Sequence, residues 1–252
     1  MPSAHCDIKT KVLTLYSASI PLHIVRQRTV AASCGFILFI SMSVGILIYY
    51  LPLYFQAASA QSAQTSGIST LPFLVTMLFA PIVSGALISL VVGYYVPFMI
   101  LGAVLTAIGA GLLHSAKQDT PKGQMSAFQF LAGLGLGLCT QIGYSAVQAV
   151  LPDESVVMGS SMVSFCNSLG PVLGSNIAQA VFANRLKELL SDTPSVDVGS
   201  VVRNGPTSNS PVAVRAAFQD ALSRSFLVPT VCGVLAFGCS LAMEWVDIKR
   251  RR

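Results

Sequence analysis

A stretch without any Asp, Glu, Lys or Arg runs from Thr29 to Ala116, and it constrains the fold of this chain most. About 20 helical residues cross the hydrocarbon layer of a membrane, so this stretch is long enough for several membrane helices. The composition of the whole chain also favours a membrane protein, because its 252 residues are 53% hydrophobic and only 10% charged. Soluble domains carry about 25% charged residues. We therefore predict an all-α integral membrane protein.

Six segments are long and apolar enough to be membrane helices. They lie at 30–55, 67–91, 96–116, 126–150, 157–182 and 225–243. The resulting organisation is an N-terminal segment 1–28, five membrane helices within 29–182, a long connector 183–224, a sixth helix 225–243 and a basic tail 244–252. Within the long connector, Val214, Phe218, Ala221 and Leu222 recur at helical spacing. This pattern predicts an amphipathic helix lying at the membrane surface.

The positions of Lys and Arg predict the orientation. Basic residues precede the first helix, at Lys9, Lys11, Arg26 and Arg28, and "KRRR" (249–252) follows the last one. Positive charge in short flanks favours the cytoplasmic side, so both termini are predicted to be cytoplasmic and the long connector exterior. The net charge of +5 lies in these flanks, so we expect the lipid bilayer as a partner and no nucleic acid.

The segment "LAGLGLGLCTQ" (131–141) raises the question of a phosphate-binding loop. It fails the dinucleotide fingerprint, because Leu138 or Thr140 stands where the third glycine is needed. Gly133 and Gly137 instead form G-x-x-x-G, a pattern of close helix contacts in membranes. Gly170 and Gly174 form a second one. We expect all four to be packing positions.

Polar residues inside the fifth helix form a stripe. It consists of Ser160, Ser164, Asn167, Pro171, Gly174 and Ala178, at spacings of three and four. Such spacing places them on one face, which is too polar for lipid and must meet another helix or an aqueous cavity. Pro171 removes the backbone bond to the carbonyl of Asn167 and predicts a kink there, either as a moving part or as plain architecture.

The fourth helix carries Gln141 and Gln148, seven residues apart, with Tyr144 between them. A glutamine amide in hydrocarbon needs a hydrogen-bond partner. Two interpretations stay open at this point: a bond to a neighbouring helix, or a substrate path.

Features of enzymes and metal sites are missing from the sequence. The predicted helices contain no Asp, Glu, Lys or Arg near their middle, and His114 lies near a helix end. The six cysteines form no C-x-x-C pair, and there is no H-E-x-x-H. We expect no catalytic residue, no metal site and no cofactor.

Several segments, in order, carry a resemblance to a known family. They are "IVRQRTVAAS" (24–33), "YYLPLYFQAASAQSAQTSGISTLP" (49–72), "GYYVPFMILGAVLTAIGAGLL" (93–113), "GLGLGLCTQIGYSAVQAVLP" (133–152) and "AQAVFANRL" (178–186). Together the chain resembles, over about 24–243, the C-terminal half of a fungal major facilitator superfamily transporter. The group is that of the drug:proton antiporters with fourteen membrane helices, which includes toxin and multidrug efflux pumps.

The resemblance implies six transmembrane helices that form one half of a major facilitator fold. It also implies export of small organic molecules, such as fungal secondary metabolites, toxins or drugs, driven by a proton gradient in the complete transporter. The plasma membrane is the expected location, with a vacuolar or other internal membrane as the alternative. Residues at matching positions, or polar ones inside the helices, are candidates for the substrate pathway: Tyr50, Gln56, Gln141, Tyr144, Gln148, Ser164 and Asn167.

The chain also departs from the family pattern. "ISLVVGYY" (88–95) lacks the basic residue that usually precedes G-Y-Y, and "NSLGPVLGS" (167–175) resembles an antiporter element of the first half. The first half itself is absent, so we expect a truncated or partial transporter. The alternative is a non-transporting remnant, or a half-transporter subunit that needs a separate N-terminal half.

Overall fold

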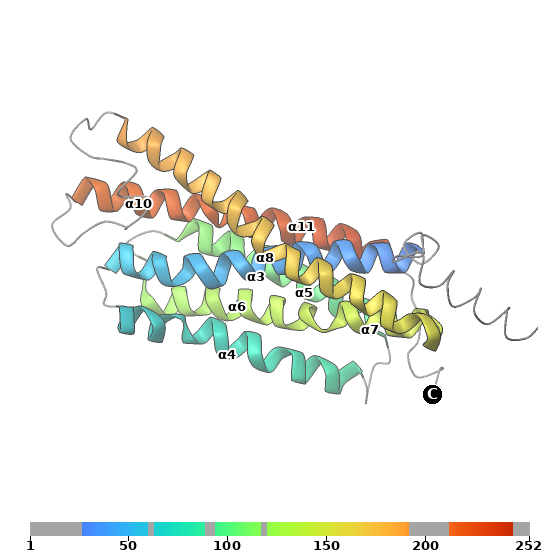
Figure 1. Cartoon of the computed structure of the whole chain (residues 1–252). Coiled ribbons are helices and arrows are strands. Elements are labelled where there is room, and N and C mark those ends of the chain that lie inside the picture. Colours follow the sequence, from blue (N-terminus) through green and yellow to red (C-terminus); the bar gives the residue numbers. More distant parts are fainter. Residues whose placement is uncertain (1–26, 60–62, 89–93, 117–119, 192–211, 244–252) are drawn as a thin grey trace, which may run out of the picture.

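The computed structural model describes residues 27–59, 63–88, 94–116, 120–191 and 212–243, which form a helical bundle (Figure 1). The helices are α3 (Arg28–Ser59), α4 (Ala63–Leu87), α5 (Val96–Ser115), α6 (Lys122–Thr140), α7 (Ile142–Val150), α8 (Asp153–Leu190), α10 (Val212–Ser225) and α11 (Leu227–Leu241). Within these described residues, six stretches are long and apolar enough to cross a membrane, which agrees with the predicted number. The predicted tail and nearly all of the N-terminal segment lie outside the described residues.

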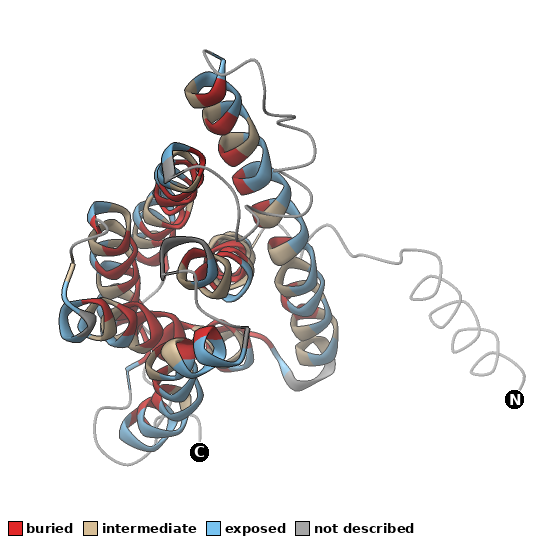
Figure 2. Cartoon of the chain, turned by 90° about the vertical axis from the view of Figure 1, so that its left-hand side faces the viewer, coloured by how far each residue is buried: buried red, intermediate tan, exposed pale blue. Residues whose placement is uncertain are grey.

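Helix α3 is the central element of the bundle. It packs against α4, α6, α7, α8, α10 and α11. Its apolar side chains Phe36, Ile37, Ile46 and Leu47 are fully buried. Figure 2 shows the same arrangement, with the buried faces of the helices turned toward one another. A helix that carries no charge after Arg28 and is apolar on most sides suits this central place.

Glycines bring neighbouring helices into close contact. A methyl group added at Gly133 of α6 would lie 2.6 Å from the carbonyl oxygen of Phe73 on α4. One added at Gly174 of α8 would lie 2.7 Å from the carbonyl oxygen of Met42 on α3. Backbones can approach so closely only where the side chain is missing, as is common between membrane helices.

Two of the six spans are divided. The segment predicted as one helix over 126–150 is interrupted for one residue at Gln141, between α6 and α7, where the backbone stays in the right-handed helical region (φ −93°, ψ −21°). The sixth span consists of α10 and α11, which meet at Phe226. Pro229 in the first turn of α11 has no N–H to bond the carbonyl of Ser225, which explains the second break.

The connector predicted over 183–224 begins with the end of α8 and ends with α10, which is where the sequence predicts its amphipathic helix. Helix α8 continues to Leu190, and its apolar residues Phe182, Leu186 and Leu190 are buried. On its exposed side, Arg185 forms ion pairs with Glu188 at 2.7 Å and with Asp220 of α10 at 3.0 Å. The predicted amphipathic helix is α10, but its apolar residues Phe218 and Leu222 are buried in the bundle. The apolar face of this helix thus packs against α8 and α3.

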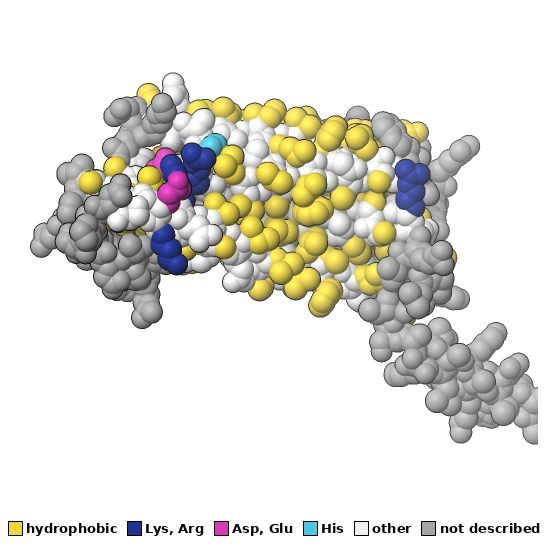
Figure 3. Space-filling view, turned by 90° about the horizontal axis from the view of Figure 1, so that it is seen from above, with side chains coloured by type: hydrophobic (Ala, Val, Ile, Leu, Met, Phe, Trp, Pro, Cys, Tyr) yellow, Lys and Arg dark blue, Asp and Glu magenta, His cyan; other side chains and the backbone are white. Residues whose placement is uncertain are grey.

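The surface separates into an apolar middle and charged ends (Figure 3). The charged residues Arg185, Lys187, Glu188, Asp220 and Arg224 lie where α8 ends and α10 meets α11. Arg28 begins α3 at the opposite end. Apolar side chains cover the surface between them in this view, as a bundle surrounded by hydrocarbon requires.

A single added methyl group tests the close contact of α6 with α4. We expect Gly133→Ala to lower the free energy of unfolding in detergent by about 1–3 kcal/mol, because the new Cβ would overlap the Phe73 carbonyl. Gly85→Ala in α4 is the matched control, since its Cβ would meet nothing within 4 Å. Equal stability of the two variants in an SDS titration would contradict the contact.

Candidate substrate pathway

Gln141 occupies the break in the fourth span. Its backbone separates α6 from α7, its side chain is exposed, and the hydroxyl of Ser145 donates to its carbonyl oxygen at 3.3 Å. Gly143, which has low helix propensity, follows two residues later. The exposed amide of Gln141 thus lies within a span that is otherwise apolar.

The next polar residues lie along α7. Gln148 is exposed, Tyr144 is half-buried, and Ala146 and Val147 on the other side of the helix are buried. The spacing from Gln141 to Tyr144 to Gln148 is three and then four residues, which places the three on one helical face. This face carries hydrogen-bonding groups but no charge.

One edge of the predicted stripe on α8 contacts α3, and the other edge is exposed. The hydroxyl of Ser41 on α3 donates to the side-chain oxygen of Asn167, which is half-buried, whereas Ser164 is exposed. At 100° per residue, Ser164 and Gly174 stand about 80° apart around the helix, at opposite edges of the stripe. Helix α3 covers the Gly174 edge and leaves the Ser164 edge uncovered.

Pro171 lies inside α8, which continues through it without a break. A methyl group on Gly45 of α3 would approach its Cα atom to 2.7 Å, and Gly170 beside it packs against Ser41 and Leu38. Pro171 is therefore part of the α3–α8 contact.

Tyr50 lies inside the bundle rather than on a cavity surface. Its side chain is 1% exposed, and its hydroxyl donates to Oε1 of Gln179 on α8 at 2.6 Å. One turn later, Nε2 of Gln219 on α10 donates to the Tyr54 hydroxyl at 3.0 Å. Gln56, the last residue of the first span, is exposed.

The candidate residues therefore fall into two groups. Gln141, Tyr144, Gln148 and Ser164 belong to partly or fully exposed surfaces of α7 and α8, whereas Tyr50 and Asn167 join α3 to α8. An exposed amide facing lipid would be costly, so the first group suits a water-filled cavity or a covering protein.

The structure adds residues that sequence reasoning missed. Ser161 and Ser168 are exposed on α8, at spacings of three and four from Ser164. Gln179 accepts the hydrogen bond of Tyr50. In the sequence, only its position next to the stripe residue Ala178 indicates that it could face another helix. Among the described residues, no group of three or more His, Cys, Asp or Glu side chains could hold a metal ion.

Comparison with known proteins identifies the family. The profile of the Major Facilitator Superfamily matches residues 31–185, more than half of the 252 residues. The chain belongs to the major facilitator superfamily. Its fold is accordingly the all-helical, six-span arrangement expected from the resemblance, and it is a multi-pass membrane protein of a transporter family.

Related members of the superfamily are fungal efflux pumps. The "MFS-type efflux pump MFS1" of Arthroderma benhamiae is 35% identical over 244 residues, 94% of this chain and 45% of that protein. "Efflux pump roqT" of Penicillium rubens is 34% identical, covering 93% of this chain and 45% of that protein. "Efflux pump aflT" of Aspergillus parasiticus is 33% identical, with 96% and 49% covered. The chain thus spans less than half the length of these relatives.

A double-mutant cycle tests the bond between Tyr50 and Gln179 in this superfamily member. We expect Tyr50→Phe and Gln179→Leu to show a coupling energy of about 0.6 kcal/mol, the average for hydrogen bonds between membrane helices. Unfolding of the four proteins in SDS measures it.

The control cycle pairs Tyr50→Phe with Asn176→Leu, whose amide bonds the carbonyl of Val172 within α8. This pair should show additive effects within about 0.3–0.5 kcal/mol. Coupling energies of equal size in both cycles would contradict a specific contribution of the Tyr50–Gln179 bond to the free energy of unfolding.

Proposed function

We propose that this chain is one half of a proton-coupled efflux transporter that exports small organic molecules, such as fungal secondary metabolites, toxins or drugs. The observation that carries the proposal is the uncharged polar face at the helix break, formed by Gln141, Tyr144 and Gln148. Relatives that are called efflux pumps support the same direction of transport.

The proposed pathway runs along α7 and the exposed edge of α8 with Ser161, Ser164 and Ser168. Its groups donate and accept hydrogen bonds but carry no charge, which favours neutral or amphipathic substrates. Tyr50 and Asn167 hold α3 against α8 and act on the pathway only through that contact. Gln56, at the end of its span, would lie at the mouth of the pathway.

A second half is the expected partner of the exposed faces. On α8, Val157 is 76% and Phe165 67% exposed, and the three serines lie among such apolar residues. A surface that mixes apolar and polar groups suits another protein better than lipid alone. The same observation favours the alternative function, a half-transporter subunit that assembles with a separately made N-terminal half.

Substitutions at the helix break test the pathway. In cells that also express the N-terminal half of a related efflux pump, Gln141→Ala and Gln148→Ala should lower the export of Nile red about two- to tenfold. This range corresponds to one lost hydrogen bond to the substrate. Protein levels, measured by blotting, should stay unchanged because both side chains are exposed.

The matched control is Gln64→Ala, an exposed glutamine at the start of the second span. It should leave export unchanged. Parallel loss of protein and export in the Gln141 and Gln148 variants would contradict a role in the pathway. Export by this chain alone would contradict the need for a second half.

We propose that both termini are cytoplasmic and that the protein lies in the plasma membrane. Lys9, Lys11, Arg26 and Arg28 near the first span support this orientation. A cysteine-reactive, membrane-impermeant label should therefore modify a loop cysteine introduced at Ser195, in a cysteine-free background, in intact cells. A cysteine introduced at Ser3 should react only after permeabilisation, and the reverse pattern would overturn the orientation.

A further inference from the structure

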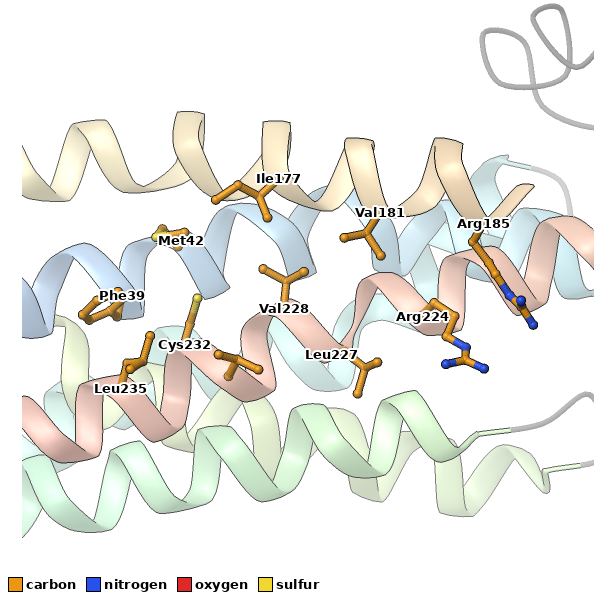
Figure 4. A pocket seen from close by; sticks show the side chains of 11 residues that line it. Phe39, Met42, Ile177, Val181, Arg185, Arg224, Leu227, Val228, Cys232 and Leu235 are labelled. Atoms are coloured by element: carbon orange, nitrogen blue, oxygen red, sulfur yellow. The ribbon is translucent and has the colours of Figure 1, made fainter. Parts of the chain in front are cut away.

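An apolar groove of about 570 Å³ lies between α3, α8 and α11 (Figure 4). Its walls are Phe39 and Met42 of α3, Ile177 and Val181 of α8, and Leu227, Val228, Val231, Cys232 and Leu235 of α11, with Arg185 and Arg224 also lining it. The volume is within the range of about 300–1,000 Å³ that is typical of ligand sites. This groove is separate from the polar face at Gln141.

The groove has one charged end. On α8, Ile177, Val181 and Arg185 follow at spacings of four, so that the apolar row ends in an arginine. On the opposite wall, the row along α11 leads back to Arg224 at the end of α10. Figure 4 shows both guanidinium groups at this end and apolar side chains along the remainder. The groove is therefore shaped for a molecule with an apolar tail and a polar head.

The two arginines differ in their partners. The guanidinium of Arg185 bonds Glu188 at 2.7 Å and Asp220 at 3.0 Å. Arg224 is exposed and forms no ion pair among the residues that the structure describes. Its five N–H donors suit a phosphate group, which can accept two parallel hydrogen bonds.

The length of the groove matches one leaflet of a bilayer. The rows from Ile177 to Arg185 and from Leu227 to Leu235 each rise by about 12 Å, at 1.5 Å per residue. Half of the hydrocarbon core is about 15 Å thick. A lipid whose head lies at Arg224 would extend its chain along the groove toward the middle of the membrane.

We propose that this groove is a phospholipid site, in which an acyl chain lies between α3, α8 and α11 and the phosphate binds Arg224. Ile177, Val231 and Leu235 keep about half of their surface exposed and form the walls that the chain contacts. The phosphate supplies the negative charge that complements the arginine. This site does not depend on the proposed export function.

Native mass spectrometry of the full chain in detergent, with two added lipids, tests the proposal. Dioleoyl phosphatidylcholine carries the phosphate, and dioleoylglycerol has the same chains without it. The chain should bind the first lipid more tightly. Arg224→Gln should weaken phosphatidylcholine binding about fivefold, which corresponds to the loss of about one hydrogen bond to the phosphate. It should leave dioleoylglycerol binding unchanged.

Further variants distinguish the contribution of the Arg224 charge to lipid binding from that of the apolar groove. Val231→Phe should weaken binding of both lipids, because the larger side chain would occupy the groove. Arg224→Lys should keep most of the preference for phosphatidylcholine, and Arg28→Gln, at the opposite end of the bundle, should change neither affinity. Melting temperatures confirm that each variant folds.

Three results would overturn the site. The first is equal affinity of the unsubstituted chain for the two lipids, and the second is equal weakening by Arg224→Gln and Arg28→Gln. The third is a dimer whose formation excludes lipid and is broken by Val231→Phe, which would make the groove an interface between two copies of the chain.

Discussion

The close contact between α3 and α8 is the interaction on which the rest of the structure depends. Inside a bilayer, apolar side chains gain nothing from leaving lipid, so helices associate through close packing and hydrogen bonds. Gly170 and Gly174 supply the packing, because any side chain there would meet the backbone of Leu38 or Met42. The same approach brings the Ser41 hydroxyl to Asn167 and the Tyr50 hydroxyl to Gln179.

This contact also separates the polar candidate residues into two kinds. Asn167 and Gln179 each accept a hydrogen bond from α3, so their side chains serve the packing of the bundle. Gln141, Gln148 and Ser164 are exposed in the described part of the chain. The first kind joins helices within the bundle, and the second would contact the substrate in the proposed pathway. The burial of each side chain distinguishes the two kinds of group, whereas the residue type alone does not.

The number of spans and the family could be predicted from the sequence, because uncharged length and ordered motifs do not depend on tertiary contacts. The glycine pairs also indicate packing positions, although the sequence does not show which helices they contact. The break at Gln141 could not be predicted, since no proline marks it. The pairing of Tyr50 with Gln179 depends on the register of α3 against α8, which no local pattern contains. Helix α10 looked like a surface helix because its amphipathic pattern does not say whether lipid or protein covers the apolar face.

Few Asp, Glu or His side chains lie within the membrane-spanning helices of this chain. Proton relays within membranes use Asp, Glu or His side chains that contact the pathway. Between Ser155 and Asn184, and again between Ser225 and Met243, the sequence contains none of them. His114 stands at the end of α5, where its Nδ1 bonds the carbonyl of Ser223 at 2.7 Å, and Asp220 is bound to Arg185. These two stretches therefore offer no group of the kind that proton relays use. In the proposed pathway, the residues of this chain would contribute uncharged hydrogen-bonding groups.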